Sequence, residues 1–130
     1  MSDAASNPLR LLIVDDELDI KTLFEQRFRK DVRTGRVQFL FAHSGEDALK
    51  LVTDLPDPKA ILILSDINMP GMTGLELLKK IKEHDPGSRV MMVTAYGDEA
   101  TRSKAISYGA ADFITKPIDF VELRKRIGLE

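Results

Sequence analysis

The chain has 130 residues, of which 43% are hydrophobic and 31% are charged, and its formal net charge is −2. This size and composition predict a single globular domain without support for non-specific or direct binding of nucleic acid. The absence of cysteine excludes disulfides and zinc–thiolate sites, and it suits a reducing cytoplasm, where we expect the protein. No apolar run approaches the roughly 20 residues of a membrane span, so we expect no membrane partner.

The first residues, MSDAASNP, lack a basic stretch followed by an apolar one, so they do not form a secretory signal. We expect a flexible N-terminal tail over residues 1–8 and one domain over residues 9–128. Residues 129–130 are a C-terminal end that is either native or a remnant of cloning.

Five apolar runs predict strands, and helical patterns alternate with them along the chain. The runs are RLLIV (10–14), VQFLFA (37–42), AILILS (60–65), RVMMVT (89–94) and ADFIT (111–115). The first, third and fourth are nearly continuously apolar, as in parallel strands covered on both faces, whereas VQFLFA alternates and fits a place nearer an edge. This alternation predicts an α/β domain with a parallel sheet and helices on both faces.

The first helical segment is predicted from five apolar residues at helical spacing, Ile20, Leu23, Phe24, Phe28 and Val32. Gly35 is placed to end this segment. Its end is rich in positive charge, at Arg27, Arg29, Lys30, Arg33 and Arg36. A solvated helix face explains these residues better than a docking patch.

Three later helices begin with capping patterns, Ser44-Gly-Glu-Asp47, Thr73-Gly-Leu-Glu76 and Asp119-Phe-Val-Glu122. The helix expected between them, over residues 98–108, has only a weak apolar stripe. That pattern favours a loosely held, movable element.

Polar residues follow the predicted strands at their carboxyl ends, where open α/β sheets bind ligands. They are Asp15, Asp16 and Glu17 after the first strand, Asp66 after the third, Thr94 ending the fourth and Lys116 after the fifth. Each residue alone has an ordinary structural explanation, such as a helix cap or a solvated charge, but coincidence does not readily explain the whole set. Clustered carboxylates are tolerated where a divalent cation neutralises them, and Mg²⁺ binds carboxylates, water and phosphate oxygens.

A phosphoryl group fits the remaining side chains of this set. Lys116 offers positive charge to phosphate oxygens, and the Thr94 hydroxyl offers a hydrogen-bond donor. Asp66 is the candidate nucleophile because carboxylates form aspartyl phosphates.

Four motifs in this order resemble the receiver domain of two-component response regulators, of the chemotaxis-regulator type, from about Leu9 to Ile127. They are VDDE (14–17), SDINMPGMTG (65–74), VTAYG (93–97) and DFITKP (112–117). The resemblance implies the flavodoxin-like fold, a doubly wound, five-stranded parallel sheet of order 2-1-3-4-5. The first helical segment is longer than the usual receiver spacing and is the main local departure from the family.

The resemblance also implies a role for each acidic residue of the set. Asp66 is the phosphoacceptor and a metal ligand, and Asp16 is the direct Mg²⁺ ligand. Asp15 acts largely through metal-bound water, and Asn68 offers its backbone carbonyl to the metal.

By the same resemblance, Thr94 and Lys116 bind phosphoryl oxygens, and Thr94 and Phe113 form the conformational switch. The bond between Lys116 and Pro117 corresponds to the family's cis peptide. Tyr96, two residues past Thr94, is a candidate shield of the acyl phosphate from water, with an ordinary surface tyrosine as the alternative.

The function implied is a phosphorylation-dependent signalling switch rather than an enzyme, although the domain assists its own phosphotransfer and autodephosphorylation. The donor is a phosphohistidine on a sensor kinase or a phosphotransfer protein. The output domain or protein binds a face formed by the fourth helix, the fifth strand and the fifth helix, and a homodimer on phosphorylation is a further expectation.

Three alternatives belong to other functional classes. A phosphatase of the haloacid-dehalogenase type needs a second aspartate two residues after the nucleophile, where this chain has Asn68. A flavin-binding module is disfavoured because three acids after the first strand repel phosphate. A degenerate receiver that binds partners without phosphorylation stays open, although the acids, Thr94 and Lys116 argue against it.

Overall fold

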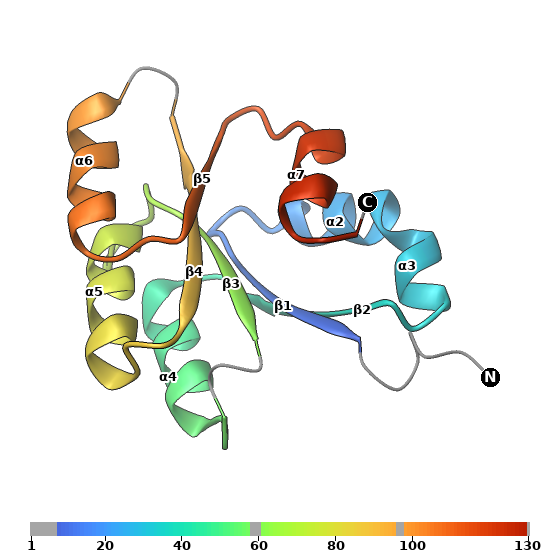
Figure 1. Cartoon of the computed structure of the whole chain (residues 1–130), viewed down its shortest axis with the longest axis horizontal. Coiled ribbons are helices and arrows are strands. Elements are labelled where there is room, and N and C mark those ends of the chain that lie inside the picture. The colour runs from blue at the N-terminus through green and yellow to red at the C-terminus, as the bar shows by residue number, and fades with distance from the viewer. Residues whose placement is uncertain (1–7, 58–60, 96–97, 130) are drawn as a thin grey trace.

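The computed structural model describes residues 8–57, 61–95 and 98–129. Five strands form one parallel sheet of order β2-β1-β3-β4-β5 (Figure 1). They are β1 (Leu9–Val14), β2 (Val37–Ala42), β3 (Leu62–Asp66), β4 (Arg89–Thr94) and β5 (Asp112–Thr115). The expected fold class and strand order are confirmed, and the alternating strand VQFLFA lies at the edge of the sheet as predicted.

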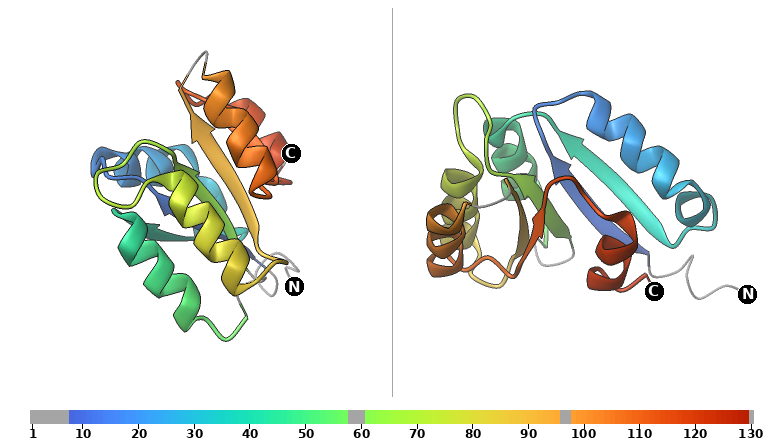
Figure 2. Two further views of the ribbon diagram at one scale, coloured as in Figure 1. Left: turned by 90° about the vertical axis from the view of Figure 1, so that its left-hand side faces the viewer. Right: turned by 90° about the horizontal axis from the view of Figure 1, so that it is seen from above.

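In the part of the chain that the structure describes, six helices cover the two faces of the sheet. They are α2 (Asp19–Arg27), α3 (Arg29–Arg33), α4 (Gly45–Asp54), α5 (Gly74–His84), α6 (Glu99–Ser107) and α7 (Phe120–Arg126). Helices α4, α5 and α6 lie on one side of the strands and α2, α3 and α7 lie on the other (Figures 1 and 2). None of the helices in the described residues is long and apolar enough to cross a membrane.

The central strands β1, β3 and β4 are nearly continuously apolar because both of their faces are buried. In β1, Leu12 and Val14 point into the core on the side of α4 and α5, whereas Leu11 and Ile13 point into the core on the side of α2 and α7. All four side chains are at most 3% exposed. Burial on both faces explains why the central strands show no alternation of apolar and polar residues.

The core on the side of α2 is rich in phenylalanine. Phe24 and Phe28 stack at a ring-centroid distance of 5.9 Å, and both meet Phe39 of β2 and Phe120 of α7 edge to face. Rings in this arrangement stabilise the core beyond the area that they bury. These contacts bring α2, β2 and α7 together.

The first helical segment departs from its sequence prediction. Phe28, with φ −115° and ψ 20°, separates α2 from α3, so the segment is two helices rather than one. As a result Val32, predicted to face the core, is 45% exposed, whereas Asp31 is only 3% exposed. Gly35 follows α3 with a positive φ of 77°, as expected for the residue that ends a helix.

The buried carboxylate of Asp31 is compensated by two arginines. Arg124 of α7 donates to it at 2.6 Å and 3.1 Å, and Arg36 donates at 3.2 Å. Arg36 also donates to the carbonyl of Leu129 at 3.0 Å, and Leu129 itself is buried. This network ties α3 to the C-terminal helix and to the residues that follow it.

The capping patterns behave as predicted. Ser44 and Asp119 accept hydrogen bonds from the first turns of α4 and α7, and Thr73 forms a complete capping box with Glu76. Helix α6 has a cap at Asp98, but its only buried residue is Ala105. Few core contacts hold this helix, in agreement with its weak apolar stripe.

Candidate functional site

Three carboxylates meet where β1 and β3 end side by side. Asp15 follows β1 directly, Asp66 is the last residue of β3, and Asp16 is next to Asp15 in the chain. One oxygen from each residue lies within 4.8 Å of the others. Asp15 and Asp66 are buried, at 5% and 4% exposure, while Asp16 is exposed. The cluster predicted from the strand ends is therefore a spatial cluster, open to solvent on the side of Asp16.

The backbone of α5 lies directly against the end of β3. The Gly74 amide donates to the carbonyl of Ile67 at 2.8 Å, and the Ser65 hydroxyl donates to the carbonyl of Asp66 at 2.9 Å. A Cβ atom at position 74 would lie 2.1 Å from the Asp66 carbonyl oxygen, which is too close for any side chain. Glycine at this position thus lets the helix fix the backbone of Asp66.

Lys116 follows β5 and reaches this cluster from the same carboxyl edge of the sheet. Its Nζ atom lies 2.9 Å from Oδ2 of Asp66, and the side chain is 36% exposed. Burial lowers the pKa of Lys116, but the hydrogen bond and attraction to Asp66, helped by Asp15 and Glu17, outweigh it and raise the pKa. Lys116 is thus a fixed positive charge beside Asp66. The peptide bond from Lys116 to Pro117 is cis.

Asp15 is held in an environment that disfavours its charged form. Burial raises its pKa, the amide of Glu17 lowers it by donating to Oδ1 at 2.9 Å, and repulsion from Asp66 raises it further. The net effect is a raised pKa even with Lys116 nearby. A carboxylate in this position gains from a cation that lies closer than the lysine does.

Thr94 ends β4 beside the acids. Val93 is in register with Asp66, so Thr94 lies one residue beyond it, and its side chain is buried at 4% exposure. Among the described residues the Thr94 hydroxyl has no hydrogen-bond partner, and its carbonyl accepts from the Lys116 amide at 2.9 Å. We call these five residues, Asp15, Asp16, Asp66, Thr94 and Lys116, the carboxyl rim.

The remaining predicted residues lie around the rim. Asn68 is exposed, and its amide is 3.4 Å from Oδ1 of Asp66. Phe113 of β5 is half-buried, and the guanidinium of Arg102 of α6 lies 5.1 Å from its ring centroid. The hypothesis for Tyr96 falls outside the described residues.

Two features next to the rim were not predicted from the sequence, a histidine contact and a cavity. Nδ1 of His43 lies 3.1 Å from the carbonyl of Asp15. A cavity of about 420 Å³ adjoins the rim and is lined by Asp15, Glu17, Ile20, Leu23, Lys116, Pro117 and Ile118. Sequence position could have indicated both features, because His43 follows β2 and Ile118 follows Lys116-Pro117 at the carboxyl ends of their strands.

The fold and the carboxyl rim together define a flavodoxin-like α/β domain with an acidic centre and a lysine at the carboxyl edge of its sheet. Residues 11–128 match the family model described as the response regulator receiver domain. The chain therefore belongs to the receiver domain family of two-component signal transduction, as its motifs indicated.

Individual relatives agree with this assignment. The chain is 36% identical over 119 residues to Sporulation initiation phosphotransferase F of Bacillus subtilis, covering 91% of this chain and 90% of that protein. It is 36% identical over 121 residues to Response regulator protein PilR of Pseudomonas aeruginosa, covering 91% of this chain but only 25% of that longer protein. A response regulator receiver domain protein of Clostridium thermocellum superposes with a TM-score of 0.80, at 26% identity, covering 92% of this chain and 90% of that one.

Proposed function

We propose that the protein is a phosphorylation-dependent switch that accepts a phosphoryl group on Asp66. One observation carries the proposal: a buried carboxylate at the end of β3 has Lys116 at 2.9 Å and the acids Asp15 and Asp16 close by. A structural ion pair would need only one carboxylate. Two further acids at the same point repel Asp66, and charge arrangements of this kind are typical of functional sites.

The donor set fits Mg²⁺, because carboxylate and carbonyl oxygens are the ligands that this ion prefers. Asp15, Asp16 and Asp66 would hold it with the backbone carbonyl of Asn68. When bound, the ion neutralises negative charge at the rim. Within the described residues, Lys116 is the one side-chain cation in an ion pair with these acids, and it pairs with Asp66 alone.

In the proposed reaction, a carboxylate oxygen of Asp66 attacks the phosphorus atom of a phosphohistidine. The oxygen–phosphorus bond forms as the bond from phosphorus to the imidazole nitrogen breaks, and that nitrogen keeps the electron pair. Lys116 then transfers its contact from the carboxylate to a phosphoryl oxygen, and the Thr94 hydroxyl donates to another. The donor is a sensor kinase or a phosphotransfer protein, and the cytoplasm is the expected location.

The output face would consist of α6, β5 and α7. Helix α6 is held by little core packing, and Arg102 connects it to Phe113. The phosphoryl group draws Thr94 towards it, Phe113 moves into the vacated space, and α6 follows. Ile106 of α6 and Val121 of α7, at 59% and 64% exposure, offer apolar surface on these helices for an output partner or a second copy.

The test is the intact mass of the protein after incubation with phosphoramidate, a small donor with a phosphorus–nitrogen bond, with and without Mg²⁺. We expect one added phosphoryl group that requires both Mg²⁺ and Asp66. Asp66→Asn should gain none, and Asp54→Asn, an exposed acid at the end of α4, should behave as the wild type. A folded wild-type protein that gains no phosphoryl group would instead be a phosphate-independent interaction module.

A further inference from the structure

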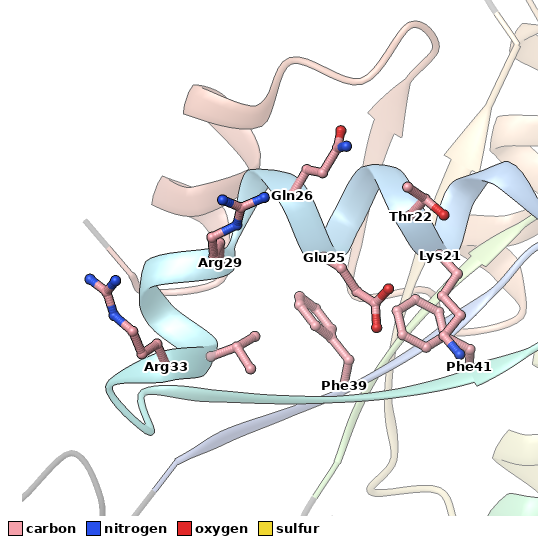
Figure 3. A pocket seen from close by; sticks show the side chains of 9 residues that line it. Lys21, Thr22, Glu25, Gln26, Arg29, Arg33, Phe39 and Phe41 are labelled. Atoms are coloured by element: carbon pink, nitrogen blue, oxygen red, sulfur yellow. The ribbon is translucent and has the colours of Figure 1, made fainter.

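A second feature of the molecule is a groove between α2, α3 and the edge strand β2 (Figure 3). It has a volume of about 710 Å³, in the range of ligand pockets, and is larger than the cavity beside the rim. Its lining residues are Lys21, Thr22, Glu25, Gln26, Arg29, Val32, Arg33, Phe39 and Phe41. We call it the β2 groove, and it has no lining residue in common with the carboxyl rim.

The groove has an apolar floor. The rings of Phe39 and Phe41 rise from β2 towards the helices with their centroids 5.7 Å apart, and Glu25 reaches from α2 towards them (Figure 3). Both rings are only half-buried, and Val32 adds exposed apolar surface because the break at Phe28 turns it away from the core. Incompletely buried aromatic side chains in a concave surface are typical of a binding site.

The charges of the groove favour an anionic partner. Lys21, Arg29 and Arg33 contribute three positive charges against one negative charge from Glu25. Within the part of the chain that the structure describes, Arg29 and Arg33 form no ion pair. Arg36, from the same segment, pairs with Asp31. All three arginines are exposed, as expected for a solvated face, and Arg29 and Arg33 also lie beside an apolar groove.

The open edge of β2 adds a third feature. Only β1 pairs with β2 in the described residues, so the outer edge of β2 carries unpaired amide and carbonyl groups. Figure 2 shows α2 running alongside this strand, which places the helix wall next to the open edge. An extended peptide can hydrogen-bond to such an edge while its side chains enter the adjacent groove.

We propose that the β2 groove binds an extended, acidic segment of a partner protein, which adds to the edge of β2 and places carboxylates against Arg29 and Arg33. A symmetric dimer through this groove is disfavoured because a two-fold axis would bring the arginines of both copies together. Single-stranded nucleic acid is disfavoured because Glu25 places a negative charge beside the rings on which bases would stack.

The probe is a fluorescent octapeptide with glutamate and valine alternating at odd positions and threonine at even positions. In a strand this order directs glutamate and valine to one face, where they meet both the arginines and the rings. Fluorescence anisotropy measures its Kd, and amide chemical shifts locate the binding. We expect saturable binding that weakens with salt and shifts concentrated in residues 29–33 and 37–42.

The variant Arg29→Glu/Arg33→Glu should weaken binding of this peptide by about tenfold or more, equal to about 1.4 kcal/mol. The matched variant Lys50→Glu/Lys80→Glu changes the charge equally on the exposed surfaces of α4 and α5 and should bind as the wild type does. A peptide with lysine in place of glutamate should also bind about tenfold more weakly.

Three results would overturn the proposal: no saturable binding up to millimolar peptide, equal affinity for the lysine peptide, or unchanged affinity in Arg29→Glu/Arg33→Glu. An oligothymidine that displaces the peptide and binds more tightly would reassign the groove to nucleic acid. Phosphorylation of Asp66 should persist in both double variants, so failure of this proposal is distinguishable from failure of the proposed switch.

Discussion

Asp31 and Asp15 are buried to a similar degree, at 3% and 5% exposure, but the protein treats their charges in opposite ways. Hydrogen bonds from Arg124 lower the pKa of Asp31, and attraction to Arg124 and Arg36 outweighs the effect of burial. Burial raises the pKa of Asp15, and repulsion from Asp66 adds to this effect. One carboxylate has all its charge compensated by the protein, and the other does not.

This difference separates a structural site from a functional one. A buried charge that is fully paired needs no ligand, and its partners join α3 to α7. A buried charge beside another carboxylate lowers the free energy of unfolding. A bound cation can reverse this loss by neutralising the two charges. The three predictions that follow change one side of this comparison at a time.

The largest effect is expected from Asp31→Asn, which should lower the free energy of unfolding at neutral pH by about 3 kcal/mol. The reason is that the Arg124 guanidinium, only 21% exposed, loses its carboxylate. Urea unfolding measures the change. The control is Asp112→Asn, which breaks an exposed pair with Arg126 and should cost at most about 1 kcal/mol.

The pH dependence of this variant follows from the lowered pKa of Asp31. The stabilising contribution of Asp31 is complete above pH 3.8, the ordinary pKa of aspartate. It is lost as the pH falls through the lower pKa of the folded state. The stability of wild type and Asp31→Asn should therefore converge in acid below that value. A difference that stays constant into strong acid would show that packing, and not charge, is responsible.

The second effect is expected from Mg²⁺, which should raise the free energy of unfolding by about 2.7 kcal/mol at a hundredfold excess over its Kd. The gain should be the same in Asp31→Asn, because that carboxylate lies outside the cluster of Asp15, Asp16 and Asp66. The gain in the free energy of unfolding on adding Mg²⁺ should be much smaller in Asp16→Asn. Thermal unfolding with and without Mg²⁺ measures all three, and an undiminished gain in Asp16→Asn would remove the rim as the metal site.

The smallest effect is expected from Asp15→Asn, which without metal should raise the free energy of unfolding by about 1 kcal/mol at neutral pH. The amide removes a desolvated charge that Asp66 repels. The destabilising contribution of Asp15 is absent below pH 3.8, grows as the pH rises above that value and is complete above its raised folded-state pKa. Urea unfolding across this range should show the gain only at the higher pH, and a loss of stability there would contradict the comparison.

The sequence was sufficient for the fold because each element carries a local signal. Continuous apolar runs marked the central strands, and the alternation in 37–42 marked the edge strand. The rim was predictable for a related reason. Parallel strands bring their carboxyl ends to one edge, so Asp15, Asp66, Thr94 and Lys116 could be placed together from strand positions alone.

What could not be read from the sequence depends on distant contacts. Asp31 and Arg124 are 93 residues apart in the chain, and nothing near Asp31 indicates that it is buried. The break at Phe28 has no proline or glycine to announce it, so Val32 was assigned to the core. The β2 groove was missed for the same reason, because it exists only when the turned segment meets Phe39 and Phe41.

The contact of Gly74 with the end of β3 has a consequence for how this gene can vary. Every missense change at a glycine codon introduces at least a Cβ atom, and here that atom would meet the Asp66 carbonyl oxygen and the Cα of Ile67. In a library of all single substitutions selected for signalling, position 74 should therefore tolerate no replacement. The clash at Gly45 is milder, because the nearest atoms, Cβ, Cγ and the carbonyl oxygen of Met72, would lie 2.9–3.0 Å from its Cβ, so this position should be less restrictive than position 74. The substitutions tolerated at position 74 would then show how tightly α5 packs against the end of β3 that carries Asp66.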